Sequence, residues 1–171
     1  MSSGVLPGCA THLLDDRHTF LLVTRRSSED WVDDAIAVLR SSNEAEYMGL
    51  DPATVFEALT ADDLRQNLLP VARRGAEDIV KLLLVGSFYS GPDASLLRPD
   101  KARDDCVRAI LDTAGEAARY FTNHGHAEEG YEANFLTANF HFNSLAATLW
   151  DVCLIAASPT TLLIVWRFED A

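Results

Sequence analysis

The feature that most constrains this chain is a pair of apolar, β-rich runs at its carboxyl end. The segment LWDVCLIAASPTTLLIVWRFED, residues 149–170, places these runs on either side of ASPT, a sequence typical of a tight turn. The second run alternates between two faces: Leu162, Ile164, Trp166 and Phe168 on one, and Leu163, Val165, Arg167 and Glu169 on the other. Because the connection is short, the two runs predict an antiparallel hairpin.

Two more segments favour strands, and the middle of the chain favours helices. TFLLVTRR (19–26) is short, β-branched and aromatic, and FLTANFHFN (135–143) alternates strictly between apolar and polar residues. Helical spacing follows capping signals at Ser27, at the pair 51–52 and at Thr60 with Asp63. Pro70 should break the helical run over 61–85. After a long loop at 86–100, a buried stripe indicates one helix from Asp100 to the vicinity of Asn123.

These elements indicate an α+β fold, with several amphipathic helices packed on a small, mostly antiparallel sheet that ends in the hairpin. The chain has 171 residues, 48% of them apolar, which is enough for one domain with a real core over 1–171. Residues 1–17 are polar and contain Gly4, Pro7 and Gly8, so we expect a loose N-terminal arm or a short edge strand.

The sequence favours a cytoplasmic bacterial protein. It lacks a basic segment followed by an apolar run at its start, and no apolar stretch approaches the length of a membrane span. The three cysteines, Cys9, Cys106 and Cys153, are far apart and odd in number, so we expect them to be reduced, with the last two in the core. Twelve Arg against two Lys, with abundant Ala, is a bias that we associate with GC-rich bacterial genomes.

The formal net charge is −12, which disfavours binding to nucleic acid or to anionic membranes and favours a basic protein partner. The carboxyl third is the most acidic part of the chain. Beyond Tyr120 it carries six acidic residues against Arg167 alone. A surface of this kind raises the rate at which a positively charged partner associates.

The stretch NHGHAEEGYEANFLTANFHF, residues 123–142, holds three of the five histidines and could supply metal ligands through His124, His126 and His141 together with Glu128. The first two histidines are two residues apart, whereas ligand pairs on a helix are four apart. We interpret His124 as the last turn of the preceding helix and Gly125 as its left-handed C′ residue. A metal-dependent hydrolase or lyase therefore remains an alternative interpretation.

Other catalytic motifs are not supported. Ser87 and Ser90 lie in a Gly-bounded loop that does not match a nucleophile elbow, and no phosphate-binding loop follows. Adjacent acidic pairs such as 33–34 and 104–105 point about 100° apart on a helix, so they do not share a proton. We expect no cofactor, and the residues favour a binding protein over an enzyme.

The leading interpretation is an acidic protein-binding module, and most specifically an inhibitor or immunity-type antitoxin that masks a basic toxin such as a nuclease. The expected contact residues combine exposed acids with an aromatic side chain, a residue type common at binding hot spots. They are Glu128, Glu129, Tyr131, Glu132 and Asp151. A further alternative is a subunit of a larger assembly.

Overall fold

A five-stranded antiparallel sheet forms the centre of the molecule in the computed structural model, which describes residues 5–14, 18–41, 52–84, 93–136, 141–148 and 150–169. Its strand order is β1-β5-β4-β3-β2, and each neighbouring pair is antiparallel. The strands are β1 (Thr19–Arg25), β2 (Leu69–Val71), β3 (Arg119–Thr122), β4 (Trp150–Ala157) and β5 (Thr161–Glu169). The predicted α+β class and C-terminal hairpin are confirmed.

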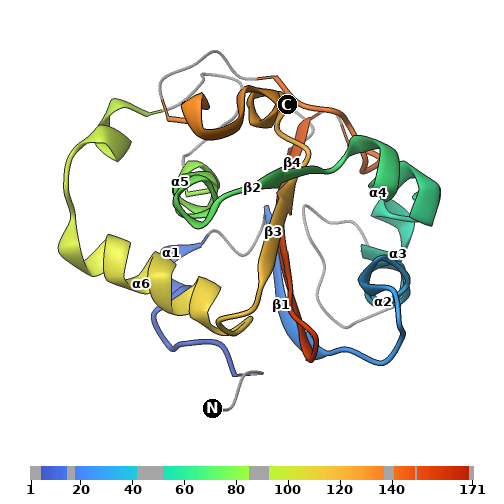
Figure 1. The fold of residues 1–171 in the computed structure, drawn as a ribbon. Helices are drawn as coiled ribbons and strands as arrows, with labels where there is room; N and C mark the ends of the chain where they lie inside the picture. Colours follow the sequence, from blue (N-terminus) through green and yellow to red (C-terminus); the bar gives the residue numbers. More distant parts are fainter. Residues whose placement is uncertain are drawn as a thin grey trace.

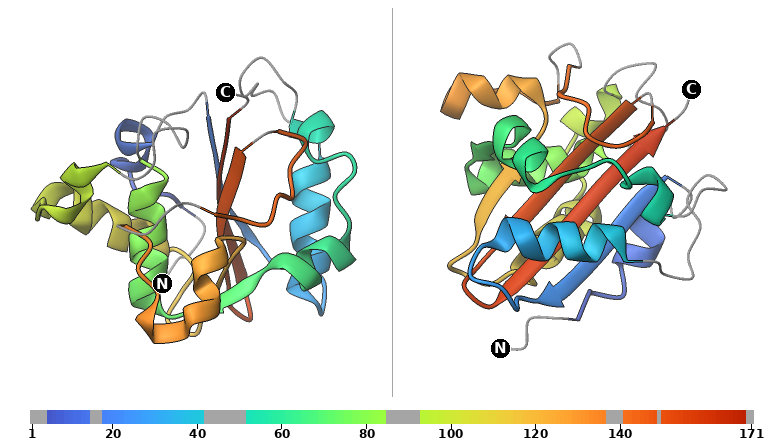
Figure 2. Two further views of the ribbon diagram at one scale, coloured as in Figure 1. Left: turned by 90° about the horizontal axis from the view of Figure 1, so that it is seen from above. Right: turned by 90° about the vertical axis from the view of Figure 1, so that its right-hand side faces the viewer.

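Helices lie on both faces of the sheet (Figure 1). One face carries α1 (Ala10–Leu13), α5 (Arg73–Leu82), α6 (Lys101–Asp112) and the 3-10 helices η2 (Ala94–Leu97) and η3 (Gly125–Glu132). The other face carries α2 (Trp31–Arg40), α3 (Pro52–Val55) and α4 (Ala61–Asn67). Two apolar clusters, one on each side, therefore bury the sheet between layers (Figure 2).

The two layers explain why the hairpin is apolar on both faces. Leu163 and Val165 of β5 belong to the cluster with α5 and α6, while Ile164 and Trp166 belong to the cluster with α2 to α4. Every residue of β5 is buried, including Arg167 at its charged end. The Arg167 guanidinium donates to the Glu169 carboxylate (2.8 Å), so the positive charge of this buried side chain is paired with a negative one.

Local start signals were predicted well, with one exception. Thr60 and Asp63 form a complete capping box at the start of α4, and Pro70 lies in β2, which separates α4 from α5 as expected. The helix after β1, however, is capped by Asp30, whose carboxylate accepts from the Val32 amide, and not by Ser27. The Ser27 hydroxyl instead donates to Asp34 (2.9 Å).

The long helix predicted from Asp100 ends much earlier than Asn123. Asp100 caps α6 as expected, but α6 stops at Asp112, and Gly115 with φ +91° leads the chain into β3. Phe121 therefore lies in a strand, opposite Pro70 and Ile155, and not on a helical stripe. The prediction failed because a short buried strand and a helical stripe share the same apolar residues over so few positions.

The amino-terminal segment is anchored, which the sequence did not predict. Cys9 forms a disulfide with Cys106 of α6, so the expectation that these two cysteines are reduced is wrong. Ala10 of α1 and Leu14 are buried in the core beside α6 in place of a loose arm over 5–14. The sequence separation of 97 residues between the cysteines gave no spacing motif to recognise. Cys153 is free and buried, as predicted.

Some predicted features fall partly outside the described residues. These are the signal at Asp51, residues 86–92 of the loop predicted over 86–100, and positions 137–140 of the strand predicted over 135–143. The described flanks of that strand show only an isolated bridge between Phe142 and His124. In the part of the chain that is described, none of the helices is long and apolar enough to cross a lipid bilayer.

Candidate functional site

The predicted acidic segment forms the 3-10 helix η3, drawn in orange above α5 in Figure 1. Its exposed side chains are four of the five predicted contact residues: Glu128, Glu129, Tyr131 and Glu132. Tyr131 is 95% exposed, the highest value among the large apolar and aromatic side chains that the structure describes as exposed. The structure therefore brings an unburied aromatic ring together with three carboxylates on one short helix.

The backbone conformation of η3 explains how Tyr131 is presented. Gly130, with φ +64°, interrupts the helical geometry directly before Tyr131, and a side chain at that position would be strained. The Ala133 amide then donates to the Gly130 carbonyl (3.2 Å) and closes the last turn. Beyond it, Phe135 is buried against Gly75 of α5, where an added Cβ would lie 3.2 Å from the Phe135 ring. The kinked turn is thus fixed to α5 on one side and projects Tyr131 on the other.

A recess of about 530 Å³ lies beside η3. Its walls come from residues 130–136, from 71–72 before α5, from Arg74, Gly75 and Asp78 of α5, and from Leu97 at the end of η2. Leu97 is 56% exposed, so two of the three exposed large hydrophobic or aromatic side chains in the described residues, Leu97 and Tyr131, line this one recess. We call the exposed face of η3 together with this recess the η3 surface.

The η3 surface also holds a half-buried carboxyl group. Asp78 of α5 lines the recess, and burial raises its pKa, while Lys81 (3.9 Å) and Arg74 act in the opposite direction. Glu132 lines the recess as well. A positively charged side chain that enters the recess would therefore meet the partly buried Asp78 carboxyl group and the exposed Glu132 carboxylate.

Three histidines meet at the start of η3. The ring centroids of His124, His126 and His141 lie 4.5 to 6.1 Å apart, although His141 is distant in sequence. His141 can approach because Gly125 has no side chain: a Cβ there would lie 1.6 Å from the His141 ring. The Gly125 amide donates to the His141 carbonyl (2.9 Å). The predicted role of Gly125 as a left-handed C′ residue is wrong, since it starts η3 and permits a close contact.

His124 caps η3 and does not end a preceding helix. It is 1% exposed, and its Nδ1 accepts a hydrogen bond from the His126 amide (3.1 Å). Burial, together with the smaller effects of the nearby His126 and His141, lowers the pKa of His124 to about 3. The ring is therefore neutral at physiological pH, with its proton on Nε2 because Nδ1 is the acceptor.

This protonation pattern does not suit a metal ligand. A ligating imidazole gives a lone pair to the metal, but the Nδ1 lone pair of His124 is used by the cap and its Nε2 carries the proton. The Nδ1 of His126 lies 3.2 Å from the Glu129 carboxylate. Within the described residues, no three His, Cys, Asp or Glu side chains are arranged to hold a metal ion. The histidines position η3, and the arrangement gives no support to the metal-dependent alternative.

The fifth predicted contact residue, Asp151, lies elsewhere. It is 0% exposed, and its carboxylate accepts from the Asn123 side chain (3.0 Å), the Ser144 hydroxyl (2.9 Å) and the Trp166 indole (3.1 Å). Burial raises its pKa, whereas the hydrogen bonds from Leu145, Ser144 and Trp166 act to lower it. A buried carboxylate cannot contact a partner, so Asp151 is removed from the predicted contact surface.

The Asp151 cluster instead supports the base of η3. Asn123 directly precedes His124, and its side-chain amide bonds Asp151 and the Asn143 carbonyl (3.0 Å) while its Oδ1 accepts from the Cys153 amide (2.9 Å). Satisfied buried polar groups of this kind fix one conformation, because each would be costly to leave unpaired. Asn123 ties the end of β3 to β4 and so sets where η3 begins.

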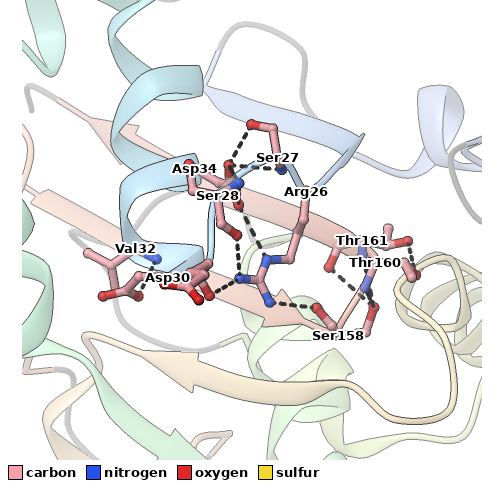
Figure 3. Close-up of polar contacts among 10 residues, drawn as sticks. Arg26, Ser27, Ser28, Asp30, Val32, Asp34, Ser158, Thr160 and Thr161 are labelled. Carbon is pink, nitrogen blue, oxygen red and sulfur yellow. Dashed lines mark hydrogen bonds and ion pairs between the residues drawn. The ribbon is translucent and has the colours of Figure 1, made fainter.

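A second buried charge cluster lies at the opposite end of the hairpin (Figure 3). Arg26 donates to Asp34 (3.3 Å) and to the carbonyls of Ser158 (3.0 Å) and Glu29 (2.7 Å). Burial alone would raise the pKa of Asp34, but hydrogen bonds from Ser27, Arg26 and Ser28 hold it below its usual value. All of these groups are used to join the start of α2 to the β4–β5 turn, which indicates a structural role.

Another recess, of about 1100 Å³, lies at the far end of β2 and β3. Arg73 and Arg119 line it together with Asp112 and Glu116, so its charges are balanced. Arg73 is already bonded to the Asp112 carboxylate (2.9 Å) and the Tyr120 hydroxyl (3.1 Å). Balanced and paired charges give this recess no marked preference for a ligand class.

Comparison with models of known protein families, with characterised proteins and with solved structures finds no match to this chain. The functional assignment therefore depends on the chemistry of the η3 surface.

Sequence reasoning found the acidic residues and Tyr131 but missed the recess and Leu97. The acids were visible because Glu128, Glu129 and Glu132 lie within five consecutive positions, on either side of Gly130. Leu97 belongs to a different segment, 34 residues before Tyr131, and only the packing of η2 and η3 on the same face of the sheet brings them to one recess. Asp78 and Asn123 were missed for the same reason.

Proposed function

We propose that this chain is an acidic protein-binding module and that the η3 surface is its contact site. The observation that carries the proposal is Tyr131, which is 95% exposed on a helix with three exposed carboxylates, beside a recess that Leu97 also lines. Exposed aromatic anchors next to a concave surface are the usual centre of a protein–protein contact. The function is recognition, with no chemical step.

Charge favours a basic partner. The chain carries a net charge of −12, and Glu128, Glu129 and Glu132 concentrate part of it around Tyr131. Complementary charge raises association rates and makes them sensitive to salt. The most specific form of the proposal is an inhibitor or immunity-type antitoxin that covers the basic surface of a toxin such as a nuclease, because such a toxin presents many lysines and arginines to nucleic acid.

The proposal predicts that a gene for a basic toxin lies next to the gene for this chain. The test pairs the chain with that toxin and measures the dissociation constant by calorimetry over a salt series. Replacing Tyr131 by Ala should weaken binding by about 30-fold, the effect of losing a hot spot of about 2 kcal/mol. Reversing the charges of Glu128, Glu129 and Glu132 to Lys should slow association and flatten its dependence on salt.

A matched triple variant separates the η3 surface from the overall charge. Asp33, Glu57 and Asp62 are exposed on the α2–α4 layer, and changing them to Lys alters the net charge by the same amount. This variant should keep Kd near the wild-type value and lose only the long-range part of the rate enhancement. Equal losses in the two triple variants would show that Glu128, Glu129 and Glu132 form no specific contact.

A further inference from the structure

The two edges of the sheet differ in how well they are protected against another strand. The edge strand β2 is three residues long and contains Pro70, which has no amide hydrogen to donate. The opposite edge strand, β1, has seven residues (TFLLVTR), no proline, no acidic residue and one charge, Arg25, at its end. Short strands, prolines and charges are the features that block edge pairing, and β1 lacks nearly all of them.

The hydrogen bonds at the ends of β1 show which backbone groups face outward. The Phe168 amide donates to the His18 carbonyl (2.9 Å), and the Arg26 amide donates to the Thr160 carbonyl (2.9 Å). In an antiparallel ladder, bonded and non-bonded positions alternate, so the backbone amides and carbonyls of the even-numbered residues of β1 point toward β5. The amides and carbonyls that point away from β5 belong to Thr19, Leu21, Val23 and Arg25.

Burial selects the part of this edge that a second chain can reach. Thr19 is 4% exposed, whereas Leu21 and Val23 are only partly buried and Arg25 is exposed. The accessible outward groups therefore belong to Leu21, Val23 and Arg25. In an antiparallel pair with a two-fold axis at Val23, Val23 faces itself and Leu21 faces Arg25, so every accessible amide and carbonyl gains a partner.

We propose that β1 pairs with β1 of a second copy of this chain, which joins two five-stranded sheets into one continuous sheet. In this register Leu22 of each copy lies opposite Thr24 of the other at a non-bonded position, where side chains are closest. Two copies of a chain with a net charge of −12 repel each other. Because β1 contains no acidic residue, it is a contact at which two like-charged copies can meet with little repulsion.

The dimer leaves the η3 surface accessible. η3 packs beside β2, at the edge of the sheet opposite β1 (Figure 2). Each copy therefore presents its own η3 surface at the far end of the joined sheet. The inference does not depend on the function proposed for η3, because a dimer would form through β1 whether or not η3 binds a partner.

The molecular mass in solution tests the dimer. Sedimentation velocity of the wild-type chain over a concentration series should approach the mass of two 18.8 kDa chains. Val23→Pro removes an outward amide that makes no bond to β5, so it should give single chains, while the matched variant Val23→Thr keeps the amide and should remain dimeric. A single-chain mass for the wild type, or a dimer that survives Val23→Pro, would overturn the proposal.

Amide hydrogen exchange tests the same contact without a substitution. The amides of Leu21, Val23 and Arg25 should exchange slowly in concentrated wild-type protein and faster on dilution. The amides of Leu22 and Thr24, which bond β5, provide the control in the same strand and should be protected at every concentration. Outward amides that exchange at one rate regardless of concentration would contradict pairing with a second copy. A strand that pairs with this edge would then have to come from another protein.

Discussion

Lowering the pH should destabilise this protein through His124, and the size of the effect follows from its environment. The pKa of His124 is about 3 in the folded chain, against 6.5 for an unburied histidine, because burial and the neighbouring His126 and His141 disfavour its charged form. Between these values the unfolded chain binds a proton that the folded chain does not, so the free energy of unfolding falls as the pH is lowered.

The magnitude can be worked from that difference. Each pKa unit corresponds to about 1.4 kcal/mol, so the stabilisation from keeping His124 neutral is complete above about pH 7 and is reduced by about 2 kcal/mol at pH 5. At about pH 4 the loss grows to about 3 kcal/mol. The loss falls first on η3, because a protonated Nδ1 can no longer accept the hydrogen bond from the His126 amide.

Urea denaturation of the wild-type chain and of His124→Asn checks this directly. The Asn carboxamide oxygen can still cap η3, but the side chain does not titrate. Between about pH 7.5 and about pH 5, the wild type should lose about 2 kcal/mol more than the variant. If the two proteins show the same change in unfolding free energy with pH, the neutral, buried state of His124 is not the cause and the reasoning fails.

Three other substitutions or treatments have defined outcomes. Asp34→Ala should lower the unfolding free energy by about 3 to 5 kcal/mol in chemical denaturation, because it leaves the Arg26 guanidinium without its carboxylate. The control variant Asp33→Ala removes an exposed carboxylate and should change the unfolding free energy by less than about 0.5 kcal/mol. Equal effects of the two substitutions would contradict the role of the buried pair. Gly125→Ala should lower the melting temperature, since its Cβ would overlap the His141 ring, whereas Gly8→Ala has nothing within 4 Å and should not; a stable Gly125→Ala would refute the close contact. Reducing the disulfide that anchors the amino-terminal segment to α6 should lower the unfolding free energy by about 2 to 5 kcal/mol, as measured by denaturation with and without reductant. Unchanged curves would show that this disulfide does not stabilise the fold.

Features that depend on neighbouring residues in the sequence were predicted from it. The alternation in residues 162–169 and the capping box at Thr60 each involve residues a few positions apart, and the structure confirms both. The end of α6 and the disulfide depend instead on which segments pack together. Nothing near Cys9 in the sequence indicates that α1 lies against α6.

The candidate site shows the same division. Glu128, Glu129, Tyr131 and Glu132 were predicted as contact residues because they form a short acidic segment that also holds an aromatic residue. Asp151 was predicted with them because it is one of the few charged residues in the acidic carboxyl third of the chain. In the structure, helices cover both faces of β4, so neither face of this strand is exposed to solvent. Asp151 therefore lies in the interior, where Asn123 and Trp166 bond its carboxylate.

That interior position gives Asp151 an indirect part in the proposed recognition. Asp151 and Asn123 fix the end of β3, Asn123 precedes the His124 cap, and the cap starts the helix that presents Tyr131. The Asn123–Asp151 hydrogen bond is buried and the His124 cap bond is partly buried, and such bonds are costly to leave half made. The exposed ring that carries the proposed contact is therefore held in place by groups that no partner touches, and a loss of affinity on changing Asn123 to Ala, with Tyr131 intact, is the expected consequence.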